Sequence, residues 1–305
     1  MAKFDTIQAF KIDHGLDVPV IKPTNEDLLL YYICAYEHEY LQMCVVSVMS
    51  MLKHTNMRDY HVSVYLDQRL LRFTADVDFL RRAGVQIHVV DGFVPKFQVP
   101  FREENKRFKR HLCIDCDAFA TPHYPVFKTL VHIEAPMACR MAFHTGMTLE
   151  EQLKVRQPQS RRMSKMPPED YLKVIRMFMG NMNINVSTLK SLAWCFGFFS
   201  MYMPSLLVGR AWAYTARFVN QFLNTTCDET LMMLCYLQDP TLVQSLEGYR
   251  LFVGRECYTK AALSKGAIVH PIGLFDNDIP KNLDILRYAT GGLNPLPFEN
   301  WKDVV

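Results

Sequence analysis

Leu112-Cys113-Ile114-Asp115-Cys116-Asp117 is a short apolar run that ends in two carboxylates one residue apart. The apolar residues are typical of a buried strand, so the acids are expected where this strand ends. Open α/β sheets bind ligands at the carboxyl ends of their strands. Because side chains at i and i+2 of a strand point the same way, Asp115 and Asp117 can close on one hard cation beside a pyrophosphate. The alternative for so short a motif is a pair of acids that only cap a strand or turn.

The chain before this motif alternates between strand and helix patterns. Strands are expected at residues 31–35, 60–66 and 85–90, and helices at 37–54 and 75–82. In the first helix the apolar residues recur at spacings of three and four, at Leu41, Val45, Val48 and Leu52. Alternation of this kind predicts an α/β fold with a mostly parallel sheet flanked by helices.

Three stretches together resemble the nucleotide-diphospho-sugar transferase (GT-A) fold, in particular the retaining family that includes glycogenin and bacterial lipopolysaccharide galactosyltransferases. They resemble that family's donor-binding strand and tyrosine, its Asp-x-Asp and its late Val-His-x-x-Gly strand. In this chain they read Ala35-Tyr36-Glu37-His38-Glu39-Tyr40, the stretch at 112–117, and Ala267-Ile268-Val269-His270-Pro271-Ile272-Gly273.

The resemblance implies a metal-dependent glycosyltransferase that moves a sugar from a nucleotide-diphosphate sugar, with a UDP-sugar expected, to a hydroxyl acceptor. Asp115, Asp117 and His270 are the expected ligands of Mn²⁺ or Mg²⁺, and Asp115 is also expected beside the donor. Such a cation would stabilise the charge that develops on the departing nucleoside diphosphate. The alternative for His270 is a satisfied histidine in the core.

Five further residues are expected to contact the donor by resemblance. Ala35, Tyr36 and Tyr40 match the part of the family that binds the nucleoside, although both tyrosines also suit core packing. Asp228 and Glu229 resemble an acidic turn near the donor sugar, where they would hold sugar hydroxyls in a retaining reaction or act as general base in an inverting one. Their alternative role is to cap the start of a helix.

The sequence departs from the family pattern at two positions. Cys195 replaces the asparagine of the glycine-containing strand, and the lysine expected shortly after His270 is absent. That lysine would contact the donor phosphate. Lys281 or a residue of the basic stretches is the substitute that the sequence offers.

The expected organisation is a single catalytic domain over residues 1–275, with an insertion around 145–168 and a C-terminal extension at 276–305. Basic stretches at 102–110 and 154–165 are either solvated surfaces or phosphate-binding surfaces. The acceptor is therefore expected to be a glycan or hydroxymethylated bases of duplex DNA. After the insertion, helices are expected at 171–179 and 206–222, and the apolar stretch 192–208 is expected to be a buried strand and turn.

Composition agrees with a cytoplasmic enzyme. The chain has 305 residues, a formal charge of +3 and nine cysteines. Without a recognisable signal peptide or membrane span, the cysteines are expected to be reduced thiols. Zinc binding by Cys113 and Cys116 is disfavoured, because strand alternation would point the two sulfurs to opposite faces and no second such pair exists.

Two other functions use some of the same features. A nucleotidyltransferase of related fold also needs paired acids and a metal, but it would favour a glycine-rich loop with Lys or Arg after the first strand, where this chain has Tyr36-Glu37-His38-Glu39. A non-enzymatic nucleic-acid-binding protein would use the basic stretches and would tolerate the loss of Asp115 and Asp117.

Overall fold

A computed structural model describes residues 4–121, 124–148, 151, 190–208, 236, 239–253, 257, 268–270 and 279–292. The strands are β1 (Asn25–Cys34), β2 (Tyr60–Asp67), β3 (Gln86–Val90), β4 (Arg110–Ile114), β5 (Phe119–Ala120), β6 (Met137–Thr148), β7 (Lys190–Tyr202), β8 (Val243–Ser245), β9 (Leu251–Val253) and β10 (Ile268–His270). The α-helices are α1 (Asp5–Ala9), α2 (His38–His54), α3 (Thr74–Arg82), α4 (Val126–Leu130), α7 (Met203–Leu206) and α11 (Ile279–Thr290). Short 3₁₀ helices are η2 (Met57–Asp59), η3 (Gln68–Arg72), η4 (Lys96–Phe101), η5 (Glu103–Asn105) and η6 (Pro240–Leu242).

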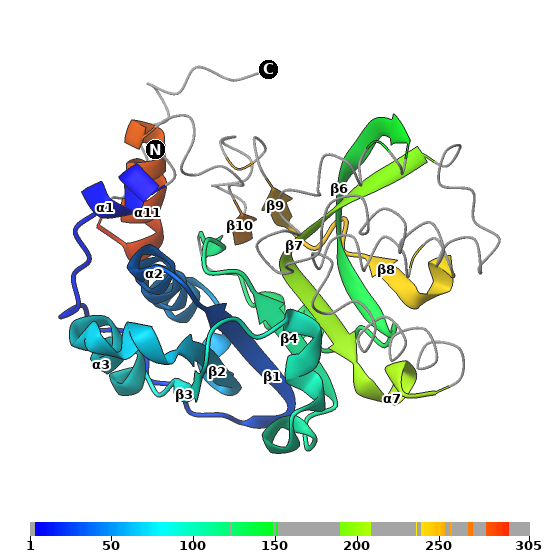
Figure 1. Ribbon diagram of the computed structural model, residues 1–305, viewed down its shortest axis with the longest axis horizontal. Helices are drawn as coiled ribbons and strands as arrows, with labels where there is room; N and C mark the ends of the chain where they lie inside the picture. The colour runs from blue at the N-terminus through cyan, green and yellow to red at the C-terminus, as the bar shows by residue number, and fades with distance from the viewer. Residues whose placement is uncertain are drawn as a thin grey trace.

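The main sheet has seven strands in the order β3-β2-β1-β4-β7-β6-β8 (Figure 1). The pairs β3-β2, β2-β1, β1-β4 and β6-β8 are parallel, and β7 is antiparallel to both of its neighbours. The fold is thus α/β with a mostly parallel sheet, as the sequence predicted. A smaller sheet, β5-β10-β9, lies beside the carboxyl end of β4.

The first strand shows how alternation divides the core. Leu30, Tyr32 and Cys34 belong to the apolar cluster that includes the buried side chains of α2. Tyr31 points to the other face, where its hydroxyl donates to the carbonyl of Lys96 in η4 at 2.9 Å. Both faces of β1 are therefore covered, as is usual for a parallel strand.

The expected elements of the first hundred residues match the structure within one or two residues, except that β1 begins six residues before the expected start. Gly84 ends α3 with a φ of 85°, a backbone conformation that favours glycine. Its amide donates to the carbonyl of Arg81, which satisfies one of the last helical carbonyls. The end of α3 is therefore determined by a residue next to it in the sequence.

The second half departs from expectation at two places. β6 continues to Thr148, so the expected insertion at 145–168 begins inside a strand. The 192–208 stretch does form a strand, β7, followed by the one-turn helix α7, but α7 ends at Leu206 and Leu207 is in a turn. The expected helix therefore does not start at residue 206. That residue is instead the last one of α7, and the chain turns directly after it. Residues 209–222 and the expected helix at 171–179 lie outside the described residues.

Helix α11 lies against α2, with α1 beside both (Figure 1). Its Ile285, Leu286 and Ala289 side chains are fully buried in the same apolar cluster as α2. The domain boundary at 275 remains a prediction, although part of the expected C-terminal extension shares the core of the sheet domain. None of the helices in the described part of the chain combines the length and apolarity of a membrane-spanning segment.

Candidate functional site

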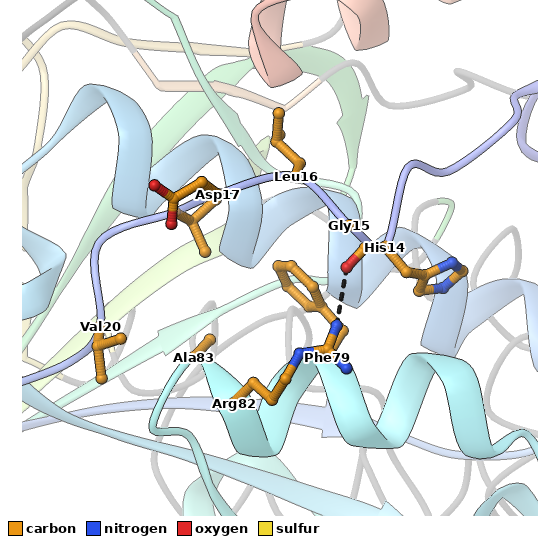
Figure 2. Close-up of a pocket in the computed structure, with 9 residues that line it drawn as sticks. His14, Gly15, Leu16, Asp17, Val20, Phe79, Arg82 and Ala83 are labelled. Carbon is orange, nitrogen blue, oxygen red and sulfur yellow. Dashed lines mark hydrogen bonds between the residues drawn. The ribbon is translucent and has the colours of Figure 1, made fainter.

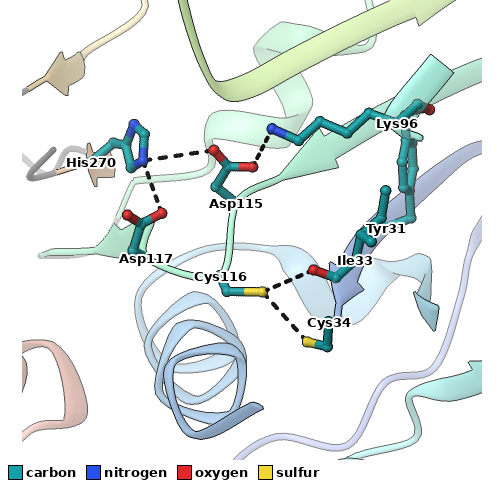
Figure 3. Close-up of polar contacts among 8 residues, drawn as sticks. All are labelled: Tyr31, Ile33, Cys34, Lys96, Asp115, Cys116, Asp117 and His270. Atoms are coloured by element: carbon teal, nitrogen blue, oxygen red, sulfur yellow. Dashed lines mark hydrogen bonds and ion pairs between the residues drawn. The ribbon is translucent and has the colours of Figure 1, made fainter. Parts of the chain in front are cut away.

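The two acids of the Asp-x-Asp lie in a tight turn between β4 and β5. β4 ends at Ile114, and the amide of Ala118 closes the turn by donating to the carbonyl of Asp115 at 3.0 Å. The acids therefore follow the strand rather than extending it, which corrects the expectation that strand alternation brings them to one side. The turn achieves the same result, because both carboxylates lie near one imidazole (Figure 3).

His270 reaches the acids through the small sheet. β10 pairs antiparallel with β5, with Val269 opposite Phe119, and β5 begins two residues after Asp117. The His270 Nε2 atom lies 2.9 Å from Asp117 Oδ1 and 3.8 Å from Asp115 Oδ2 (Figure 3). One ligand atom from each of the three residues lies within 4.8 Å of the others, so the group can hold a metal ion.

The electrostatics of this group favour an ionised Asp117 carboxylate. Burial by itself raises the pKa of Asp117, but the positive charge and hydrogen bond of His270 outweigh burial and leave the pKa below its ordinary value. An anionic oxygen pair with an imidazole nitrogen is a suitable donor set for Mn²⁺, since carboxylates prefer hard cations and imidazole accepts transition metals.

Lys96 is a candidate site residue that sequence reasoning missed. Its Nζ atom lies 2.6 Å from Asp115 Oδ1, and only 13% of its side chain is exposed. Tyr31 holds the Lys96 carbonyl, and the adjacent Phe97 is buried with its ring 4.8 Å from that of Phe199. Lys96 follows Pro95 in a segment without strand or helix periodicity, so no pattern marked it. The ammonium group beside Asp115 thus comes from η4. Lys281, which the sequence offered as a substitute for the missing lysine, lies in α11.

An aromatic surface lies where the chain leaves the carboxyl ends of β1 and β3. Tyr36 follows β1 with a φ of 77°, and 47% of the residue is exposed. Its ring stacks on Phe93, with centroids 5.9 Å apart and planes at 11°. The pKa of Asp67 is lowered to about 2, chiefly by side-chain hydrogen bonds from Arg69, and the Tyr36 amide makes a smaller contribution by donating to the same carboxylate. Asp67 thereby fixes the unusual backbone of Tyr36.

The other two residues expected at the donor are less open. Ala35 is buried at the end of the strand. The Tyr40 ring packs edge-on against Phe4, with centroids 5.4 Å apart. Of the expected nucleoside contacts, Tyr36 is the side chain that the fold leaves most accessible.

The start of α2 is held by a buried carboxylate, Asp76, which contacts two histidines. Asp76 of α3 is buried, and its two oxygens lie 2.7 Å from His14 Nε2 and from His38 Nε2. The His38 ring stacks on Phe73 at a centroid distance of 3.5 Å. Because His38 is the first residue of α2, this network holds the chain that follows Tyr36.

A cleft of about 570 Å³ lies between the N-terminal segment at residues 14–20 and the C-terminal end of α3, and neither acid lines it. Its lining includes Asp17, Val20 and Phe79, and Arg82 donates across its edge to the carbonyl of His14 at 2.8 Å (Figure 2). It contains none of the residues expected at the donor or the metal. The convergence of carboxylate, imidazole and ammonium groups marks the candidate site better than this cleft does.

The remaining predictions fall partly outside the described residues. Asp228, Glu229 and the basic stretch 154–165 lie there. The stretch 102–110 is described, and four of its five cations form ion pairs within the chain while Arg107 lies over the Phe108 ring, which gives no support to duplex DNA binding. The ion pairs are Arg102–Glu104, Lys106–Glu103, Lys109–Asp27 and Arg110–Glu134.

Solved structures resemble this chain although no family model and no curated protein match its sequence. The bifunctional glycosyltransferase WbbM superposes with a TM-score of 0.51 and 13% identity, over 92% of this chain and 52% of WbbM. The chain has the GT-A fold. It spans about half the length of WbbM.

Two other glycosyltransferases match this chain at lower similarity. Mouse xyloside xylosyltransferase 1 has a TM-score of 0.47 and 10% identity over 82% of this chain and 99% of its own. The galactosyltransferase LgtC, solved with donor and acceptor sugar analogs, has a TM-score of 0.45 and 12% identity over 89% of this chain and 98% of its own. The fold assignment rests on WbbM.

Proposed function

We propose that this chain is a metal-dependent glycosyltransferase that moves a sugar from a nucleotide-diphosphate sugar, with UDP as the nucleotide, to a hydroxyl of a glycan. The observation that carries the proposal is the meeting of Asp115, Asp117 and His270 at the carboxyl end of a parallel strand. Ligand sites of open α/β sheets occupy this position. Paired acids with a histidine fit a divalent cation, Mn²⁺ or Mg²⁺.

Each part of the site has a role in this proposal. A divalent cation, when bound, supplies positive charge that stabilises the departing nucleoside diphosphate. Asp115, Asp117 and His270 hold that cation, and Lys96 adds a second positive charge beside Asp115. Lys96 thus takes the phosphate-contacting role of the missing late lysine.

The aromatic surface receives the nucleoside. A base can stack on the exposed face of the Tyr36 and Phe93 pair, since aromatic stacking on a base is worth about 1–3 kcal/mol. Tyr40 and Ala35 support this strand end. Asp228 and Glu229 are proposed to contact the donor sugar, where they hold its hydroxyls or act as general base.

Release of nucleoside diphosphate from a panel of nucleotide sugars, with Mn²⁺, Mg²⁺ or chelator, tests the proposal. Asp117→Asn keeps the shape of the side chain and removes its charge. We expect roughly 100-fold or more loss of metal-dependent release, since metal stabilisation of the transition state is worth several kcal/mol. Asp78→Asn, an exposed acid on α3, is the control that should retain activity.

Two results would overturn the assignment. One is a folded wild-type protein that releases no nucleoside diphosphate from any donor in the presence of glycan acceptors. The other is equal metal-dependent release by wild type and Asp117→Asn.

A further inference from the structure

Three buried sulfur atoms lie directly behind the Asp-x-Asp turn. Cys34 is the last residue of β1, Cys44 lies in α2, and Cys116 stands between the two acids. The Cys34 and Cys116 Sγ atoms are 3.4 Å apart, and all three sulfurs lie within 4.8 Å of one another (Figure 3 shows the first pair). Cys34 and Cys44 are fully buried and Cys116 nearly so. Cysteine spacing in the sequence does not predict this cluster, because Cys116 is more than 70 residues from the other two cysteines.

The polar groups nearest the cluster are already bonded to one another. The Ser47 hydroxyl donates to the carbonyl of Ala118 at 2.5 Å and lies 3.2 Å from the hydroxyl of Tyr32. The Cys116 sulfur lies 3.4 Å from the carbonyl oxygen of Ile33. Among the described residues, the group that can hold an ion here contains three thiols and no imidazole or carboxylate.

We propose that Cys34, Cys44 and Cys116 form a three-coordinate thiolate site for one soft monovalent d¹⁰ cation, Cu⁺. Soft thiolate ligands select Cu⁺ and Zn²⁺, but structural Zn²⁺ sites almost always have four ligands. With metal–sulfur bonds of about 2.3 Å, a planar three-coordinate ion separates its sulfurs by about 4 Å. That spacing falls between the 3.4 Å contact and the 4.8 Å limit of the cluster.

The cluster and the candidate catalytic site select different ions. Asp115, Asp117 and His270 offer oxygen and nitrogen, which suit Mn²⁺ or Mg²⁺, whereas the sulfurs do not. Each thiol gives up its proton to solvent when the soft cation binds. Because the sulfurs are shut off from solvent, the ion enters while the chain folds, as in other buried structural metal sites. The proposal is therefore independent of glycosyl transfer.

Refolding the full chain without oxygen, in the presence of Cu⁺ buffered by bicinchoninate, measures the site directly. We expect one Cu⁺ retained per wild-type chain after removal of the chelator. Changes around a metal's ligands cost roughly 10–100-fold in affinity, so loss of a ligand in Cys44→Ala should weaken retention by about 100-fold or more. Alanine suits the middle of α2. Cys139→Ala, a buried cysteine on β6 outside the cluster, should bind as wild type does.

X-ray absorption on the copper-loaded wild type decides the coordination without any variant. Three sulfur neighbours at about 2.3 Å are expected. Copper held by two sulfurs, or by nitrogen and oxygen, overturns the proposal, as does equal retention by Cys44→Ala. A folded wild-type chain that retains no copper, or that retains four-coordinate Zn²⁺ in preference to Cu⁺, overturns it as well.

Discussion

Lys96 is placed to compete with a cation for one carboxylate. Its ammonium lies 2.6 Å from Asp115 Oδ1, so a bound metal would share that acid with a positive charge. Lys96→Met keeps most of the side-chain stem and removes the charge. We expect Mn²⁺ alone to bind the variant several-fold more tightly, about 1 kcal/mol, while the nucleotide sugar binds more weakly. Calorimetric titration with Mn²⁺ and then with donor separates the two effects.

Lys96→Arg is the matched comparison, because it retains the charge. It should stay closer to wild type in both titrations. Weaker Mn²⁺ binding by Lys96→Met would show that the lysine supports the metal site instead of competing with the metal.

His111 makes stability depend on pH. The residue is fully buried on β4, and burial lowers the pKa of His111 from an ordinary 6.5 to about 4. The folded state therefore favours the neutral ring, and this contribution is complete above pH 6.5 and is lost as pH falls toward 4. The shift corresponds to about 3 kcal/mol. We expect His111→Leu to flatten the fall in unfolding free energy between pH 7 and pH 4.5, measured with urea.

The exposed His132→Gln serves as control and should keep the wild-type slope over this range. An unchanged slope in His111→Leu would mean that other groups cause the acid sensitivity.

At the scale of elements, Asp76 joins three segments that are far apart in the sequence. It binds His14 of the N-terminal segment and His38 at the start of α2 while belonging to α3. Asp76→Ala leaves both imidazoles without their carboxylate partner. We expect the unfolding free energy to fall by about 2 kcal/mol, the usual cost of orphaned polar groups, as measured by urea denaturation.

Asp78→Ala on the same helix is the matched control. Asp78 is exposed and pairs with Arg81, so its loss should change stability by no more than about 0.5 kcal/mol. If Asp76→Ala and Asp78→Ala were equally stable, the His14–Asp76–His38 network would contribute no more to stability than a surface ion pair does.

At the scale of the molecule, the two ends of the described chain share one core. α11 packs on α2 and α1, and Leu286 is fully buried there. Leu286→Ala should lower the free energy of unfolding by about 2–5 kcal/mol. We expect far-UV circular dichroism and tryptophan fluorescence to report the same single transition at lower denaturant.

Exposed Arg287→Ala provides the comparison and should leave the midpoint nearly unchanged. If α11 belonged to a separate extension, Leu286→Ala would instead add a small early transition and leave the main one in place. That outcome would support the boundary predicted at residue 275.

The sequence by itself determined the alternation of strands and helices from β1 to β3, and the Asp-x-Asp after β4. These features follow from local periodicity and from turn residues such as Gly84, because each depends on neighbours a few positions away. The long strand β6 was missed, and the one-turn helix α7 ends where a longer helix was expected.

Only the tertiary structure decided which side chains meet. His270 and Asp117 are 153 residues apart, and they meet because β10 pairs with β5. Lys96 reaches Asp115 because Tyr31 and Phe97 anchor η4 on one face of the sheet. The three cysteines meet where a strand, a helix and a turn converge. Periodicity shows which face of an element is buried, but strand pairing and packing across the sheet determine what that face contacts.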